Sequence, residues 1–80
     1  MRRYYFDMRE EDHLAVDLEG LELPDIESVQ EEAVQSLGEL ARDTVREPNY
    51  SCDRKRRIAI EVRDITGPVL QVKCTIETVR

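Results

Sequence analysis

The feature that most constrains the fold is that only one segment of the chain has helical periodicity. Between Pro24 and Pro48, apolar residues recur at steps of three and four, which places them in one stripe along a helix. The stripe consists of Ile26, Val29, Ala33, Leu37, Leu40, Ala41 and Thr44/Val45. A single amphipathic helix cannot bury its apolar face by itself, so the rest of the chain must supply a second layer.

The two ends of this helix are also marked in the sequence. Pro24 disfavours helical backbone angles at Leu23, and the Asp25 carboxylate can accept hydrogen bonds from the first free N–H groups of a helix. Pro48 is predicted to end the helix. The acidic residues at its start are therefore interpreted as a helix beginning and not as a site.

The remaining segments alternate with period two, which predicts strands with one apolar face. The apolar residues that share a face are Tyr4, Phe6 and Met8 in the first segment, Leu14, Val16 and Leu18 in the second, Ile58, Ile60 and Val62 in the third, and Leu70, Val72, Cys74 and Ile76 in the fourth. Residues 21–23, next to Pro24, are predicted to form at best a short edge segment.

The last two strands have a register that places all their apolar side chains on one face. It pairs Val62 with Leu70, Ile60 with Val72 and Ile58 with Cys74. The register leaves Ile65-Thr66-Gly67 as a three-residue turn, with Gly67 where a positive φ is needed. On the polar face, Glu61 is expected to meet Lys73 across the strands.

The predicted fold class is α+β, with the order β-β-α-β-β in a single domain of residues 1–80. One amphipathic helix packs on one face of an antiparallel sheet, and the other sheet face is polar enough to meet water. A chain of this length buries only about 60–65% of the surface that its unfolded form exposes, so its core is thin. We therefore expect little room for a deep active site.

The net charge of −6 disfavours general binding to nucleic acid or to anionic membranes. The charge is uneven, because residues 1–50 carry 5 Lys/Arg against 14 Asp/Glu and residues 51–80 carry 7 against 4. No apolar run reaches the roughly 18–20 residues that span a bilayer, and no signal sequence is visible. We therefore expect a cytoplasmic protein whose Cys52 and Cys74 are free thiols, with a disulfide between them as the alternative.

The densest group of carboxylates contains Asp7, Asp17, Glu19, Glu22 and Asp25. A solvated strand face plus a helix cap is the expected explanation, with cation binding or acid–base catalysis as alternatives. The single histidine, His13, is expected to be exposed. No nucleophile motif or metal-ligand spacing is present, so we expect no catalytic residues, no metal and no cofactor.

The sharpest candidate for a binding site is the basic stretch Arg54, Lys55, Arg56 and Arg57. These cations could contact an acidic protein surface, including that of another copy, or the phosphates of a nucleic acid. They could also be a solvated start of a strand. Nucleic acid is the less favoured partner, because Tyr50 is the one nearby aromatic residue that could stack on bases.

Three motifs resemble those of a family of short uncharacterised alphaproteobacterial proteins of the rhizobial type. The matching pieces are Arg3-Tyr4-Tyr5-Phe6-Asp7, the stretch from Asp17 to Asp25, and Val62-Arg63-Asp64 with Gly67-Pro68-Val69-Leu70. The order of elements is also similar to the N-terminal half of HicB-type antitoxins. The family resemblance implies the fold and carries no activity over to this chain.

The sequence therefore predicts a non-enzymatic protein-interaction or regulatory accessory domain. Its expected partner is another protein or a second copy, since one helix over four strands leaves strand edges and apolar margins uncovered. The alternative is a HicB-like antitoxin or a nucleic-acid-linked regulator that uses Arg54–Arg57. A small hydrolase or isomerase built across a dimer interface has little support.

Overall fold

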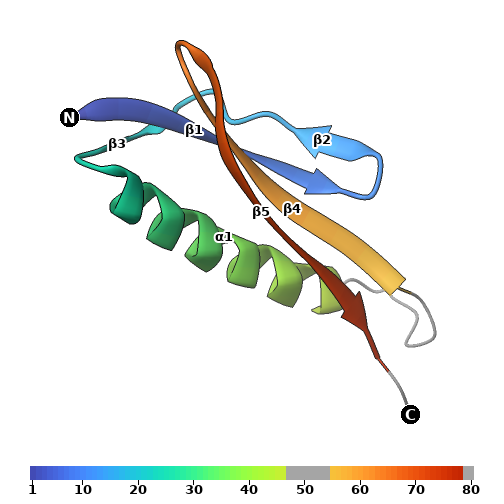
Figure 1. Ribbon diagram of the computed structural model, residues 1–80. Coiled ribbons are helices and arrows are strands. Elements are labelled where there is room, and N and C mark those ends of the chain that lie inside the picture. The colour runs from blue at the N-terminus through green and yellow to red at the C-terminus, as the bar shows by residue number, and fades with distance from the viewer. Residues whose placement is uncertain (47–54, 79–80) are drawn as a thin grey trace.

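The computed structural model describes residues 1–46 and 55–78, and it confirms an α+β fold in which one helix packs on an antiparallel sheet (Figure 1). The elements are β1 (Arg2–Glu10), β2 (His13–Ala15), β3 (Leu21–Leu23), α1 (Ile26–Arg46), β4 (Lys55–Asp64) and β5 (Gly67–Glu77). The order is thus β-β-β-α-β-β, with residues 21–23 as a strand of their own. No helix in the described part of the chain combines the length and apolar character needed to cross a bilayer.

The sheet has the order β2-β1-β4-β5, and β3 also pairs with β1. All these pairs are antiparallel, and β2 and β3 share one side of β1. β3 lies against residues 2–4 of β1, and β2 lies against residues 8–10. The two borders of the sheet therefore differ, because β1 is flanked by two short strands whereas the long strand β5 is itself an edge.

Helix α1 begins where the sequence predicted. The Asp25 carboxylate accepts a hydrogen bond from the backbone N–H of Ser28 at 2.8 Å. That bond lowers the pKa of Asp25 below its ordinary value. The helix ends at Arg46, and Pro48 lies outside the described residues.

The core lies between α1 and the sheet. It is formed by Tyr4, Val29, Ala33, Ile60 and Val62, all buried, and Phe6, Leu23, Leu37, Leu40, Val69, Leu70 and Val72 pack around them. The helix packs mainly against β4 and β5. Figure 1 shows α1 running along this half of the sheet. The middle of the predicted apolar stripe packs on the sheet as expected, whereas Ile26 and Val45 at its ends are 52% and 43% exposed.

The second strand is shorter than predicted. Strand β2 ends at Ala15, and Val16 and Leu18 are 52% and 86% exposed. The alternation of residues 14–18 was therefore misleading, because Asp17 bonds to backbone groups in a turn, as described below. This side chain competes with the strand ladder for the local backbone.

The predicted β4–β5 register is confirmed, since Val62 pairs with Leu70, Ile60 with Val72 and Ile58 with Cys74. The turn is tighter than predicted, because Asp64 pairs with Gly67 and only Ile65 and Thr66 lie between the strands. The register shifts between Val62 and Arg63. Gly67 has the expected positive φ, at 126°. Glu61 meets Arg9 of β1 at 2.6 Å, and not Lys73.

Candidate functional site

The open face of the sheet, opposite α1, carries an ion pair between Asp7 of β1 and Arg63 of β4. The Arg63 Nε donates to Asp7 Oδ2 at 2.9 Å, and its guanidinium lies 4.6 Å from the centre of the Tyr5 ring. Asp7 is only 6% exposed. The sequence had placed Asp7 on a solvated face, and this was wrong because Arg63 and residue 17 cover the carboxylate.

Asp17 is the centre of a second set of bonds that extends this pair. Its carboxylate accepts backbone N–H groups of Phe6 at 3.1 Å, Glu19 at 3.1 Å and Gly20 at 3.2 Å. Its own N–H donates to Asp7 at 2.9 Å. Burial disfavours the charged form of Asp17, but the three N–H donors and Arg63 outweigh it, so the pKa of Asp17 is lowered.

Gly20 completes the anchored turn at residues 17–20. Its φ of +74° lies in the left-handed region that favours glycine. A Cβ on Gly20 would lie 2.9 Å from both the Arg3 Cγ and the Tyr4 carbonyl oxygen. The chain can therefore pass this close to β1 only without a side chain at this position.

The other carboxylates of the predicted group do not converge. Glu22 lies 3.7 Å from Arg3, and Asp25 caps the helix. Asp64, on the open turn between β4 and β5, accepts the Thr66 hydroxyl at 2.6 Å and its N–H at 2.8 Å, which lowers the pKa of Asp64. Within residues 1–46 and 55–78, no group of three or more His, Cys, Asp or Glu side chains is placed to hold a metal ion.

The predicted basic stretch is divided by the geometry of β4. Lys55, Arg56 and Arg57 are its first residues, and Arg54 lies outside the described part of the chain. Successive strand side chains point to opposite faces, so Arg56 lies on the helix side and the other two on the open face. Side-chain alternation therefore prevents these cations from forming one continuous patch.

Arg56 is largely buried, with 13% of its side chain exposed, and its Nη1 lies 3.5 Å from Glu10 Oε1. The same Glu10 oxygen accepts the Thr44 hydroxyl of α1 at 2.9 Å. Arg56 thus helps to join β1, β4 and the end of α1. Lys55 lies 3.8 Å from Glu77, and both side chains are mostly exposed.

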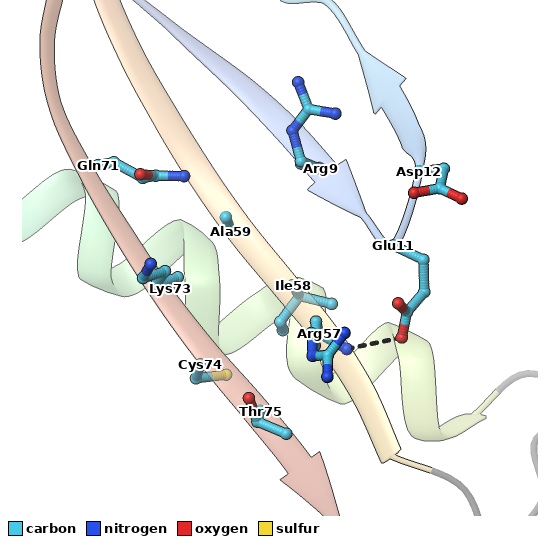
Figure 2. Close-up of a pocket in the computed structure, with 10 residues that line it drawn as sticks. All are labelled: Arg9, Glu11, Asp12, Arg57, Ile58, Ala59, Gln71, Lys73, Cys74 and Thr75. Atoms are coloured by element: carbon cyan, nitrogen blue, oxygen red, sulfur yellow. Dashed lines mark hydrogen bonds between the residues drawn. The ribbon is translucent and has the colours of Figure 1, made fainter.

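A shallow hollow on the open face brings together cations that the sequence had not grouped. Figure 2 shows Arg9, Arg57 and Lys73, from three adjacent strands, around the small side chain of Ala59. Glu11 also lines it and binds the Arg57 backbone N–H at 2.9 Å. The usable signal in the sequence was alternation, because Arg57, Ala59 and Lys73 all fall on the polar face.

Two further predictions concern His13 and the cysteines. His13 is exposed, as expected, although it begins β2 instead of lying in a connection. Cys74 is a free thiol of intermediate burial on β5. Cys52 lies outside the described residues.

Together these features define a small α+β domain in which one helix lies on an antiparallel sheet, and in which side-chain hydrogen bonds fix the sheet edge at β1. The chain belongs to the family described as a domain of unknown function, DUF6894, whose family model matches residues 3–75. This range contains all three motifs that carried the resemblance to an uncharacterised family. No curated protein and no solved structure gives a significant match.

Proposed function

We propose that this domain is a non-enzymatic protein-interaction module of the cytoplasm that works as a homodimer. The observations that carry the proposal are that β5 is an edge of the described sheet and that α1 carries exposed apolar side chains, Val34 and Val45 among them. The carboxylates that offered an alternative in acid–base catalysis are occupied otherwise, because Asp7, Asp17 and Asp25 bind backbone groups or arginine.

β5 presents the longest uncovered edge of the sheet. Among residues 1–46 and 55–78, no strand pairs with its outer side. Unpaired backbone N–H and C=O groups on such an edge are a template for another strand. A second β5, added antiparallel about a two-fold axis, would extend the sheet and match the helix-side apolar residues of both copies.

A second row on α1 consists of Val34, Gly38, Ala41 and Val45, spaced four, three and four residues apart, of which Ala41 is half-buried and the other three are exposed. Val34 and Val45 are 54% and 43% exposed, and a Cβ on Gly38 would meet nothing within 4 Å. This spacing forms a straight row suited to a second helix. Because α1 packs on β4 and β5, pairing at β5 would bring two copies of α1 side by side.

Sedimentation analysis of three proteins tests this proposal. The native chain is expected to sediment as a dimer, and Val34→Glu is expected to yield a folded monomer, because a charge would enter the helix contact. Gln35→Glu, which adds the same charge on an exposed neighbouring position, should remain dimeric. A native chain that stays monomeric at high concentration would refute the homodimer.

A nucleic-acid-linked regulator, including an antitoxin of the HicB type, is the second candidate. It would use Arg57 and Lys73, which come from neighbouring strands and line one hollow on the open face together with Glu11 and Asp12. Titration with single-stranded and duplex oligonucleotides at two salt concentrations tests it. Salt-sensitive binding that Arg57→Ser and Lys73→Ser weaken would support this candidate.

A further inference from the structure

The second row on α1 has a spacing that reads the same from both ends, because its steps are four, three and four residues. A two-fold axis through the middle of the row would place Val34 against the partner's Val45. The same axis would place Gly38 against the partner's Ala41. A Cβ built on Gly38 would meet no atom within 4 Å, so a second helix can approach closely at this point. The row is therefore complementary to its own copy.

Strand β5 is also complementary to its own copy, but only in certain registers. Because side chains alternate, a two-fold axis keeps the apolar side chains of both copies on the helix side only if it passes a residue and not the gap between two residues. An axis at Lys73 would place two lysines directly opposite each other, which is unfavourable. An axis at Val72 places Gln71 opposite the partner's Lys73 instead. The strand alone therefore leaves Val72 and Cys74 as the nearest alternatives.

Hydrogen bonds and strand pairs show which residue of β5 lies level with the middle of the row. The Thr44 hydroxyl of α1 donates to Glu10 of β1 at 2.9 Å. Glu10 pairs with Ile58 of β4, and Ile58 pairs with Cys74 of β5, so Thr44 is level with Cys74. The middle of the row lies four to five residues before Thr44, or about 7 Å along the helix. Two strand residues span the same distance of about 7 Å, and α1 runs in the same direction as β5 (Figure 1), so the middle of the row is level with Val72.

The lateral distances agree with an axis beside β5. Helix α1 packs on both β4 and β5, so it lies above the boundary between these two strands. Neighbouring strands are about 4.8 Å apart, which places α1 about 5 Å from an axis on the outer side of β5. The two copies of α1 would then be about 10 Å apart, which is close to the spacing of about 8–10 Å between packed helices.

We infer that two copies of this chain join about a two-fold axis that passes Val72 of β5 and the middle of the second row on α1. This inference rests on the proposed homodimer and specifies which residues meet. Strand pairing covers residues 70–74, because the register of β5 is irregular before Leu70 and Pro68 has no backbone N–H. The strand and the helix row are different elements, and one axis satisfies both.

Cross-linking between cysteines on the open face of β5 tests the register. Both native cysteines are first replaced by serine, and one new cysteine then replaces Gln71, Lys73 or Thr75, which are all exposed. A short bifunctional thiol reagent is expected to link Gln71→Cys to Lys73→Cys several times more than it links Lys73→Cys to Thr75→Cys. The first two positions face each other across an axis at Val72, whereas the other two are four residues, or about 13 Å, out of register.

Each other outcome of the cross-linking has a defined meaning. If Lys73→Cys links best to Thr75→Cys or to itself, the axis lies elsewhere on β5, and the inference is overturned while the homodimer stands. A dimer that forms no cross-link at these positions would show that β5 is not in the interface. A native chain that sediments as a monomer would refute the homodimer and this inference together.

Charge pairing on α1 is a second test. Val34→Glu is expected to yield a monomer, and adding Val45→Lys should restore the dimer, because the new opposite charges face each other across the axis. Within one helix the two positions are 11 residues, or about 16 Å, apart, so they cannot pair inside one copy. Gln35→Lys added to Val34→Glu is the matched control, since neighbouring residues of a helix do not face each other, and it should stay monomeric. Equal sedimentation of the two double variants would overturn the inference.

Discussion

The two edges of the sheet are built in different ways. At the β1 edge, two short strands and the anchored turn at residues 17–20 occupy the backbone groups of β1. At the other edge, β5 is long and regular beyond its first residues and has no described neighbour on its outer side. The first edge is closed by polar side chains and one glycine, whereas the second is left for a partner to close.

The largest expected effect comes from filling the space at the closed edge. Gly20→Ala should destabilise the domain by about 3 kcal/mol, because it combines left-handed strain with a close contact to β1. Urea unfolding followed by circular dichroism would measure this loss. A loss below about 1 kcal/mol would show that the turn can move away from β1 at little cost.

The next largest loss of stability is expected from removing the Asp17 carboxylate, which is the hydrogen-bond acceptor at the same edge. Asp17→Ala should cost about 2–3 kcal/mol, because three backbone N–H groups lose a charged partner. Amide hydrogen exchange should rise first at Phe6, Glu19 and Gly20. Unchanged exchange there would contradict the anchoring role of Asp17.

Acid should weaken the hydrogen bonds that Asp17 makes at the closed edge and those that Asp64 makes in the β4–β5 turn. Asp17 and Asp64 have lowered pKa values in the fold, so their stabilisation is fully present above the unfolded Asp pKa of about 3.9. It is lost as the pH falls through their lower folded values. Stability measured between about pH 6 and 2.5, a range that spans the ordinary Asp pKa, should decline less steeply in Asp17→Asn than in the native chain.

The smallest effect on stability is expected at Gly38 of α1. Substitutions at this position also test the proposed dimer contact. In the isolated fold, Gly38→Ala should stabilise α1 by up to about 1 kcal/mol, because nothing contacts the new methyl group. Gly38→Leu should add bulk to the proposed helix contact and weaken the dimer. If Gly38→Leu sediments like the native chain, α1 is not part of the dimer interface.

Local patterns predicted most of the elements and their faces. The helix limits, the Asp25 cap and the β4–β5 register all depend on residues near one another in the chain. The second strand was predicted too long, because its alternation continued through Asp17 into a turn. Its side-chain bonds to Phe6, Glu19 and Gly20 are not visible as a hydrophobic period.

The candidate surfaces were less predictable than the fold. The basic stretch looked like one patch in the sequence, but alternation along β4 places Arg56 on the helix side, where it meets Glu10. The hollow around Ala59 combines residues from three strands. Such groupings depend on sheet order, which no single segment contains.

The sequence by itself determined one amphipathic helix, the alternating strands and the turn at Gly67, because backbone propensity and hydrophobic period act over a few neighbouring residues. Only the tertiary structure decided that Asp7 is buried by Arg63, a residue 56 positions away. It also decided which half of the sheet α1 covers and which edge stays open. Those outcomes depend on contacts between distant segments, and the chain forms these contacts only when it folds.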